Sequence, residues 1–287
     1  VGHLRGGLAQ VNVMNSVLIG GMSGSASADA AIDSKVLVPI MRRKGYSNGF
    51  ASALTATSSV FSPLLPPSIS LVIYGVMADV SIGDLFMSGI GVSAVMLVVM
   101  MLTVHVMSIR NGYEPSRKRA TAGEIWAAFR ASIFALLMPV LLLVGLRAGV
   151  FTPTELAAVA VIYSLFVAMV IYREIHWRHL LPIFREAALT TAMIMLIIAA
   201  AGAFGLVVSY EQVPRLLKTA LDTAAISPTM FMVILSVALL IAGTVLESLS
   251  LMIILIPVLA PMGASLGIPP EQLGLLLVLI FTLGGIT

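Results

Sequence analysis

The chain alternates long apolar runs with two kinds of polar interruption. One kind is charged, as in Arg42-Arg43-Lys44, 110–119 and 173–179, and separates pairs of apolar runs. The other kind is rich in glycine and serine and lies where an apolar run would otherwise continue, as in "GGMSGSASADAA" at 20–31 and "ALLIAGTVLESLSL" at 238–251. The apolar runs lack the period-two alternation of a membrane strand, so they predict helices.

Composition places these helices in a membrane. Hydrophobic residues make up 59% of the 287 residues and charged residues 10%, with a mean hydropathy of +1.08, far from the balance of soluble domains. A chain of this length has room for roughly eight to ten spanning segments. The pattern therefore predicts an all-α integral membrane protein.

Charge and motifs exclude several other classes. The net charge is +3, but the basic residues cluster beside apolar runs, as topology signals do, so we expect no nucleic acid partner. Cysteine is absent, and the histidines show no zinc spacing. The sequence has neither a P-loop for ATP nor a GxSxG nucleophile motif. We therefore expect no enzyme and no ATP hydrolysis on this chain.

Placing the basic clusters on the cytoplasmic side gives crossings that return in pairs. Thr152-Pro153-Thr154-Glu155 reads as a helix start, which favours a capping role for Glu155 over a transport role. The predicted organisation is a first re-entrant hairpin at 1–47, a broken helix and following transmembrane helix at 48–109, a cytoplasmic loop and interfacial helix at 110–132, scaffold transmembrane helices at 133–209, an external interfacial helix at 210–227, a second re-entrant hairpin at 228–270, and the start of a second broken helix at 271–287.

The first glycine- and serine-rich stretch has both flanks on the cytoplasmic side. Its arms contain the apolar runs Leu8 to Ile19 and Ala30 to Met41. With its flanking residues, each arm is about 15 residues or about 23 Å long, too short to cross comfortably. A non-helical tip at membrane depth needs protein or a watery cavity around its backbone. Ser25 or Ser27 can cap the returning helix, whose N-terminus favours an anion, while free carbonyl and hydroxyl oxygens suit sodium. The alternative is that small residues merely allow close helix packing.

The second stretch repeats this pattern with the opposite entry. Its arms are Pro228 to Ala242 and Ser250 to Leu266, and we expect both ends on the external side. Each hairpin is followed by a segment rich in helix breakers, "SSVFSPLLPPSISLVIYG" at 58–75 and 273–287. Two opposed hairpins followed by two broken helices predict an inverted-repeat transporter with its site near the midplane.

Three acidic residues in these hairpins have open roles. Asp29 is a functional candidate because it lies within the membrane, or it complements the helix dipole. Asp33 and Lys35 are two apart and cannot share a helix face. Glu247 is either a helix-start cap or a residue with a proton- or substrate-linked role. An anionic substrate should avoid fixed carboxylates, so none of the three is expected to be its primary ligand.

An ordered set of motifs resembles a known family over nearly the whole chain. The segments "GGLAQVNV", "GGMSGSASADAA", "IMRRKGYSNGFASALTA", "LLPPSISLVIYG", "VSIGDLFMSGI" and "TPTELAAVAVIYSL" resemble the large membrane subunit of tripartite ATP-independent periplasmic (TRAP) transporters. Such subunits have further helices before the first hairpin and a double proline after the Gly284–Thr287 motif. By that resemblance we expect the sequence to be an internal fragment of a longer subunit.

The resemblance implies a function and partners. It implies a sodium-driven, elevator-type importer of small organic acids in the bacterial inner membrane, a multi-pass protein in the lipid bilayer. Its partners would be a small four-helix membrane subunit and a periplasmic substrate-binding protein that largely sets selectivity. Candidate substrates are C4-dicarboxylates, sialic acid, other sugar acids and ectoine-like compounds.

The resemblance also implies where sodium binds, between each hairpin tip and the following broken helix. The chain reads "SPLLPP" where the family often has a "GPLIPP"-like run, a departure that falls on Ser62. The residues carried over for the first sodium site are Ser23, with Gly20 or Ser25, and Ser62, Leu65 and Pro67; those for the second are Gly243, Gly284 and Thr287. The candidate substrate contacts are Ser25, Ser27, Asp29 and Ser248.

Other transport classes share much of this pattern. A stand-alone sodium-coupled carboxylate or ion carrier would also have hairpins and double-proline breaks, but it would need no binding protein. A channel matches the composition, whereas two opposed dead-end hairpins favour alternating access.

Overall fold

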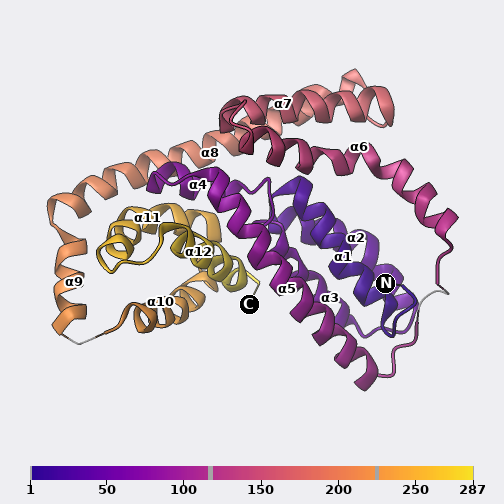
Figure 1. Cartoon of the computed structure of the whole chain (residues 1–287), viewed down its shortest axis with the longest axis horizontal. Coiled ribbons are helices and arrows are strands. Elements are labelled where there is room, and N and C mark those ends of the chain that lie inside the picture. The colour runs from indigo at the N-terminus through magenta and orange to yellow at the C-terminus, as the bar shows by residue number, and fades with distance from the viewer. Residues whose placement is uncertain (1, 116–118, 224–225, 287) are drawn as a thin grey trace. The chain divides into compact units, whose positions relative to one another are not determined.

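The protein is described by a computed structural model that covers residues 2–115, 119–223 and 226–286 (Figure 1). Within these ranges every regular element is a helix, which confirms the all-α prediction. Thr287 of the predicted second sodium site and Arg117 and Lys118 of a predicted cytoplasmic cluster lie outside the described residues. The helices are α1 (Gly7–Ser23), α2 (Ala26–Arg43), α3 (Asn48–Ser58), the 3-10 turn η1 (Ser59–Phe61), α4 (Ile69–Ala78), α5 (Ile82–Arg110), α6 (Ala122–Arg147), α7 (Pro153–Phe166), the π-helical turn η2 (Val167–Ile171), α8 (Trp177–Tyr210), α9 (Val213–Thr223), α10 (Pro228–Gly243), α11 (Ser248–Ser265) and α12 (Pro270–Gly284).

Five stretches of the described chain are helical, long and apolar enough to cross a membrane. They are α5, α6, the continuous stretch Pro153–Ile171, α8 and α11. Three shorter apolar helices, α4, α10 and α12, accompany them. This supports an integral membrane protein, with fewer full-length spans than the eight to ten that the length alone allows, because several apolar segments are short helices. Helix α11 is itself long enough to span, so the re-entrant path of the second hairpin stays a prediction.

The chain forms two compact units. The first comprises Val1–Ile69 and Phe86–Ser164, and the second comprises Ser70–Leu85 and Leu165–Thr287. Each unit contains one of the two predicted hairpins.

In the first unit, α1 and α2 form a tight helical hairpin and lie side by side (Figure 1). Helix α1 ends at Gly24, which has a left-handed φ of 62° and donates its N–H to the Gly20 carbonyl at 3.3 Å, as glycine does at helix ends. Ser25 then caps α2 by accepting the Ala28 N–H at 3.4 Å. The interruption is therefore confined to two residues, whereas the sequence pattern suggested a longer one over 20–31. Of the two predicted caps, Ser25 is confirmed and Ser27 lies inside the first turn.

Helix α3 and η1 pack against both arms of this hairpin. The core includes Ala9, Val13 and Met41 from the hairpin, Leu54 from α3 and Val104 from α5. An aromatic cluster of Tyr46, Phe50 and Tyr113 closes one end, with the Tyr46 and Tyr113 ring centroids 4.2 Å apart. The hairpin, the first half of the broken helix and α5 thus form one packed body.

Helices α6 and α7 begin with the same type of cap. Thr121 and Glu124 form a capping box at the start of α6, so the helix begins well before residue 133, where the scaffold helices were expected to start. The helix that was predicted to lie in the interface before residue 133 is the first part of α6. At α7, Thr152 accepts the Glu155 N–H and donates its own N–H to the Glu155 carboxylate at 2.8 Å. This confirms the capping role of Glu155.

In the second unit, α12 is the common partner of α10 and α11, which both pack against it (Figure 1). Glu247 caps α11 by accepting the Leu249 N–H at 3.0 Å and the Ser250 N–H at 2.6 Å. Helix α4 also belongs here: the Tyr74 hydroxyl donates to the Pro270 carbonyl at 2.8 Å, and the Tyr74 ring lies against Gly274. Helix α9, the predicted external interfacial helix, packs against α8 and α11.

Candidate functional site

The first hairpin tip rests directly on the double-proline break. A Cβ atom on Gly20 would lie 2.9 Å from the Ser62 Cα, and one on Gly24 would collide with the Pro67 carbonyl oxygen. Because only glycine lacks that atom, both positions permit a close backbone approach. The predicted first-site residues Gly20 and Ser62 are therefore in contact. Pro67, another predicted first-site residue, lies beside Gly24.

The remaining first-site candidates flank this contact. Ser23 is the last residue of α1, and its hydroxyl lies 3.5 Å from the Ser25 N–H. Leu65 lies in the turn between η1 and α4 and packs against the core of the first unit. Ser62 directly follows η1 and is fully buried. The candidates therefore come from two chain breaks that face each other.

Buried oxygen atoms without hydrogen bonds lie in the same region. The Ser62 hydroxyl and both carboxylate oxygens of Asp29 are buried and have no hydrogen-bond partner. The Ser62 and Ser16 hydroxyls lie close to the Asp29 carboxylate, but neither reaches it with hydrogen-bond geometry. Buried polar groups normally have hydrogen-bond partners, so these oxygen atoms are candidates for binding a ligand. Hydroxyl and carboxylate oxygens are ligands that a hard cation takes, and the residues present therefore fit sodium.

A second buried carboxylate, Asp33, is fully engaged in a hydrogen-bonded network. It accepts from the Asn15 side-chain amide at 2.6 Å and from the Ser16 hydroxyl at 3.2 Å. The Ser16 hydroxyl also lies 2.9 Å from the Ser58 hydroxyl, so the network links both arms of the hairpin to α3. The Asp33 carboxylate is therefore held by structural hydrogen bonds, whereas the Asp29 carboxylate makes no such bond.

The network continues with residues that the sequence reading did not single out. Ser58 donates to the Asn12 side-chain oxygen at 3.0 Å, and the Asn12 amide donates to the Thr55 hydroxyl at 2.9 Å. A signal for it exists, because Asn12, Asn15 and Ser16 stand at i, i+3 and i+4 in an apolar run and so share one helix face. This polar stripe predicts a buried polar contact.

The second hairpin meets its following helix through two glycines. A Cβ on Gly284 would lie 2.9 Å from the Gly243 Cα and 3.0 Å from the Leu240 carbonyl oxygen. The Ser248 hydroxyl donates to the Phe281 carbonyl at 2.7 Å. The predicted second-site residues Gly243 and Gly284 are thus in contact, and Ser248, a predicted substrate contact, ties α11 to α12.

The other substrate candidates gather at the first turn of α2. The Ser25 and Ser27 hydroxyls are 3.1 Å apart, and Asp29 follows in the same turn. Ser27 is exposed, whereas Asp29 is fully buried. Ser25, which is half-buried, and Ser27 lie at a helix N-terminus, where an anion is favoured. In the described part of the chain, no group of three or more histidine, aspartate and glutamate side chains is placed to hold a metal.

Comparisons with known proteins identify a transporter family. The family model described as the DctM component of the tripartite ATP-independent periplasmic transporter matches residues 1–287. The chain is 38% identical over 287 residues to the large permease protein of the 2,3-diketo-L-gulonate TRAP transporter of Escherichia coli. It is 36% identical to that of the sialic acid TRAP transporter of Vibrio cholerae and 34% identical to that of the C4-dicarboxylate TRAP transporter of Pseudomonas aeruginosa. Each match covers 100% of this chain and 67% of the relative.

Proposed function

The chain belongs to the family of the DctM component of tripartite ATP-independent periplasmic transporters, and from this premise we propose that it serves a sodium-coupled importer of small organic acids. Its relatives are transporter permease proteins, so it is a membrane transport protein and not an enzyme. As the large membrane subunit it would work with a small four-helix membrane subunit and a periplasmic substrate-binding protein in a bacterial inner membrane.

The observation that carries the proposal is a contact of the same kind in each compact unit. Gly20 meets Ser62 where the first hairpin reaches its broken helix, and Gly243 meets Gly284 at the corresponding place in the second unit. Helices that stop within a membrane leave carbonyl groups without intrahelical partners. Two such junctions support two sodium sites related by an inverted repeat.

At the first site, the side chains have distinct roles in this proposal. Ser62 supplies an unpaired hydroxyl and Asp29 an unpaired carboxylate. A bound sodium ion would supply positive charge that offsets the carboxylate and attracts an anionic substrate. We therefore assign Asp29 to the sodium side of the site, because a fixed negative charge would repel an organic acid.

On the substrate side, Ser25 and Ser27 offer hydroxyls at the N-terminus of α2. The positive end of the helix dipole favours a carboxylate there. The Ser248 hydroxyl already donates a hydrogen bond to the Phe281 carbonyl. Toward a substrate it can therefore only accept a hydrogen bond. In this proposal the carboxylate of the substrate binds at the first hairpin.

The proposed motion is an elevator, in which the hairpins and broken helices move against a scaffold. The tightly packed first hairpin with α3 and η1 supports movement as a rigid body, because packed interiors transmit displacement rather than absorb it. The second hairpin is held in a comparable way by α12.

The experiment is uptake of radiolabelled organic acids into proteoliposomes that contain the full-length subunit with its small partner. The sodium gradient and the cognate binding protein are each supplied or withheld. The proposal predicts uptake only when both are present. Uptake that needs sodium but is unchanged by the binding protein would instead favour a stand-alone sodium-coupled carboxylate carrier. Uptake without sodium would overturn both.

A further inference from the structure

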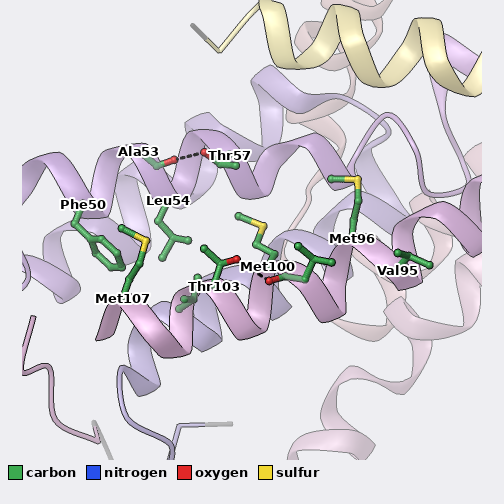
Figure 2. Close-up of a pocket in the computed structure, with 11 residues that line it drawn as sticks. Phe50, Ala53, Leu54, Thr57, Val95, Met96, Met100, Thr103 and Met107 are labelled. Atoms are coloured by element: carbon green, nitrogen blue, oxygen red, sulfur yellow. Dashed lines mark hydrogen bonds between the residues drawn. The ribbon is translucent and has the colours of Figure 1, made fainter. Parts of the chain in front are cut away.

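An apolar cavity of 480 Å³ lies between α3 and α5 in the first unit, away from the hairpin tip. Figure 2 shows Phe50, Leu54 and Thr57 of α3 facing Met96, Met100, Thr103 and Met107 of α5 across it. We name this cavity the α3–α5 groove and propose that it binds one acyl chain of an anionic membrane phospholipid, whose phosphate lies beside Arg110.

The lining of the α3–α5 groove selects an apolar occupant. Its two hydroxyls are already used within their own helices, because Thr57 donates to the Ala53 carbonyl at 2.7 Å (Figure 2) and Thr103 donates to the Val99 carbonyl at 2.8 Å. The groove therefore has no free side-chain donor for a polar ligand. Three methionines line it, and their flexible side chains adapt to a chain of variable shape.

The length of the groove matches one leaflet. It extends along α5 from Val95 to Met107, which at 1.5 Å per residue is about 18 Å. Half of a bilayer's hydrocarbon core is about 15 Å. One acyl chain lying along α5 would therefore run from the headgroup level toward the midplane.

The charge at one end of the groove identifies the headgroup. Met100, Thr103 and Met107 follow one face of α5, and Arg110 continues that face one turn beyond Met107. Arg110 is exposed. Because the basic cluster at residues 42–44 marks the cytoplasmic side, this end lies at the level of the inner leaflet headgroups.

On the α3 side, the same end is both basic and open. Phe50 lines the groove and contacts the Tyr113 ring, with ring centroids 5.3 Å apart. Tyr113 also accepts the Ser47 N–H at 3.3 Å through its hydroxyl, so the chain after α5 joins the chain before α3 at this point. Lys44 is exposed, and a Cβ on Gly49 would meet nothing within 4 Å. The N-terminus of α3 lies at the same end, and a helix N-terminus favours an anion.

The balance of charge in the two flanking stretches is positive. Residues 42–50 and 110–115 contain Arg42, Arg43, Lys44 and Arg110 against Glu114. Juxtamembrane basic residues attract anionic lipids, and basic pockets between helices on the cytoplasmic side bind their headgroups. The charge at this end therefore favours an anionic glycerophospholipid over a zwitterionic one.

The test is native mass spectrometry of the full-length subunit, extracted with its partner and exchanged into mixed phosphatidylglycerol and phosphatidylcholine. The wild type should retain one phosphatidylglycerol. Thr103→Trp fills the groove and should lower that occupancy about ten-fold, a loss of about 1.4 kcal/mol in binding. Leu102→Trp is the matched control, because Leu102 neighbours Thr103 but does not line the groove and is 61% exposed. Ala53→Leu fills the groove from α3 and should also lower the retention of phosphatidylglycerol. It replaces Thr103→Trp as the test if that variant does not fold.

The headgroup assignment has its own control. Arg110→Ala should reduce the preference for phosphatidylglycerol over phosphatidylcholine about five-fold, in line with the contribution of one basic residue near an anionic surface. Arg185→Ala, an exposed arginine of α8, should leave that preference unchanged. Wild-type protein without bound lipid, or equal lipid retention in Thr103→Trp, Ala53→Leu and Leu102→Trp, would overturn the proposal. An unchanged preference in Arg110→Ala would overturn the assignment of the phosphate.

Discussion

The two hairpins present a similar pattern in the sequence, but they are built from different interactions. In the first, the arms pack against each other and against α3, and the interior contains the buried polar side chains Asn12, Ser16, Asp33 and Ser58. In the second, α10 and α11 pack against α12, and the contact includes Gly243 and Gly284 and the hydrogen bond from Ser248 to the Phe281 carbonyl.

The two hairpin tips also differ in their burial. Gly24 and Asp29 of the first tip are buried, whereas residues 244–247 of the second tip are exposed, with Val245 at 82%. The first hairpin therefore combines backbone contact with buried charge, and the second relies on backbone contact. If sodium binds at both junctions, as we propose, the first site would therefore offer it a buried carboxylate, whereas the second would offer it mainly backbone oxygen atoms.

The largest expected effect comes from adding a methyl group at the glycine contacts. Gly284→Ala would force its Cβ against the Gly243 Cα, and Gly20→Ala would do the same against Ser62. Overpacking of this kind costs about 1–3 kcal/mol and displaces the backbone. We expect both variants to lose sodium-driven uptake, measured in proteoliposomes.

The controls for this test are glycines with open surroundings. A Cβ at Gly91 or at Gly202 meets nothing within 4 Å, so Gly91→Ala and Gly202→Ala should transport normally. Normal uptake by Gly20→Ala or Gly284→Ala would show that close backbone contact is not what the junctions require.

The next effect separates the buried carboxylate from the exposed one. Asp33→Asn weakens hydrogen bonds from Asn15 and Ser16, and losing the charged acceptor should lower the free energy of unfolding by about 1.5–3 kcal/mol. Glu247→Gln keeps a side-chain oxygen at the exposed cap of α11 and should cost less. Thermal unfolding in detergent measures both. Equal stability of the two variants would contradict the difference drawn between the hairpins.

A smaller effect distinguishes a serine with a structural hydrogen bond, Ser248, from a serine proposed to bind sodium, Ser62. Ser248→Ala removes the bond to the Phe281 carbonyl and should cost about 1 kcal/mol of stability. Ser62→Ala removes a hydroxyl without a partner, so stability should hold while the sodium concentration for half-maximal uptake rises. A stability loss in Ser62→Ala with unchanged sodium dependence would reverse these roles.

The smallest effect is expected at the start of α7, outside both hairpins. The Thr152 N–H donates to the Glu155 carboxylate at 2.8 Å, and the Thr152 hydroxyl donates to it at 2.9 Å. Glu155→Gln keeps a side-chain oxygen that accepts these hydrogen bonds, whereas Glu155→Ala removes it. In thermal unfolding in detergent, Glu155→Ala should therefore melt slightly below Glu155→Gln, with a smaller loss than that of Ser248→Ala. Equal melting temperatures of the two Glu155 variants would contradict this capping role.

The sequence predicts the interruptions well because glycine, proline and capping residues act locally. Ser25, Thr152 and Glu155 are caps in the structure as their spacing suggests. Helix α6 was predicted too short, although Thr121 and Glu124 repeat the Thr152 and Glu155 pattern. The first tip was predicted too long, because serine and aspartate also fit the first turn of a helix.

Tertiary partners were harder to predict, for a physical reason. Asp29 and Asp33 lie four apart on one helix and look equivalent in the sequence, but Asp33 meets Asn15 and Ser16 across the hairpin whereas Asp29 has no partner. That distinction depends on how two helices are rotated about their axes. Whether these residues and the glycine junctions hold sodium and substrate stays a prediction.

The most direct measurement is the binding of radioactive sodium to the purified full-length subunit with its small partner, compared among wild type, Gly20→Ala, Gly243→Ala and Gly202→Ala. Two sodium sites at the glycine junctions predict that Gly20→Ala and Gly243→Ala each lose part of the wild-type binding, whereas Gly202→Ala retains it. Wild-type sodium binding in both junction variants, in protein shown to be folded, would contradict the claim that these junctions are where sodium binds.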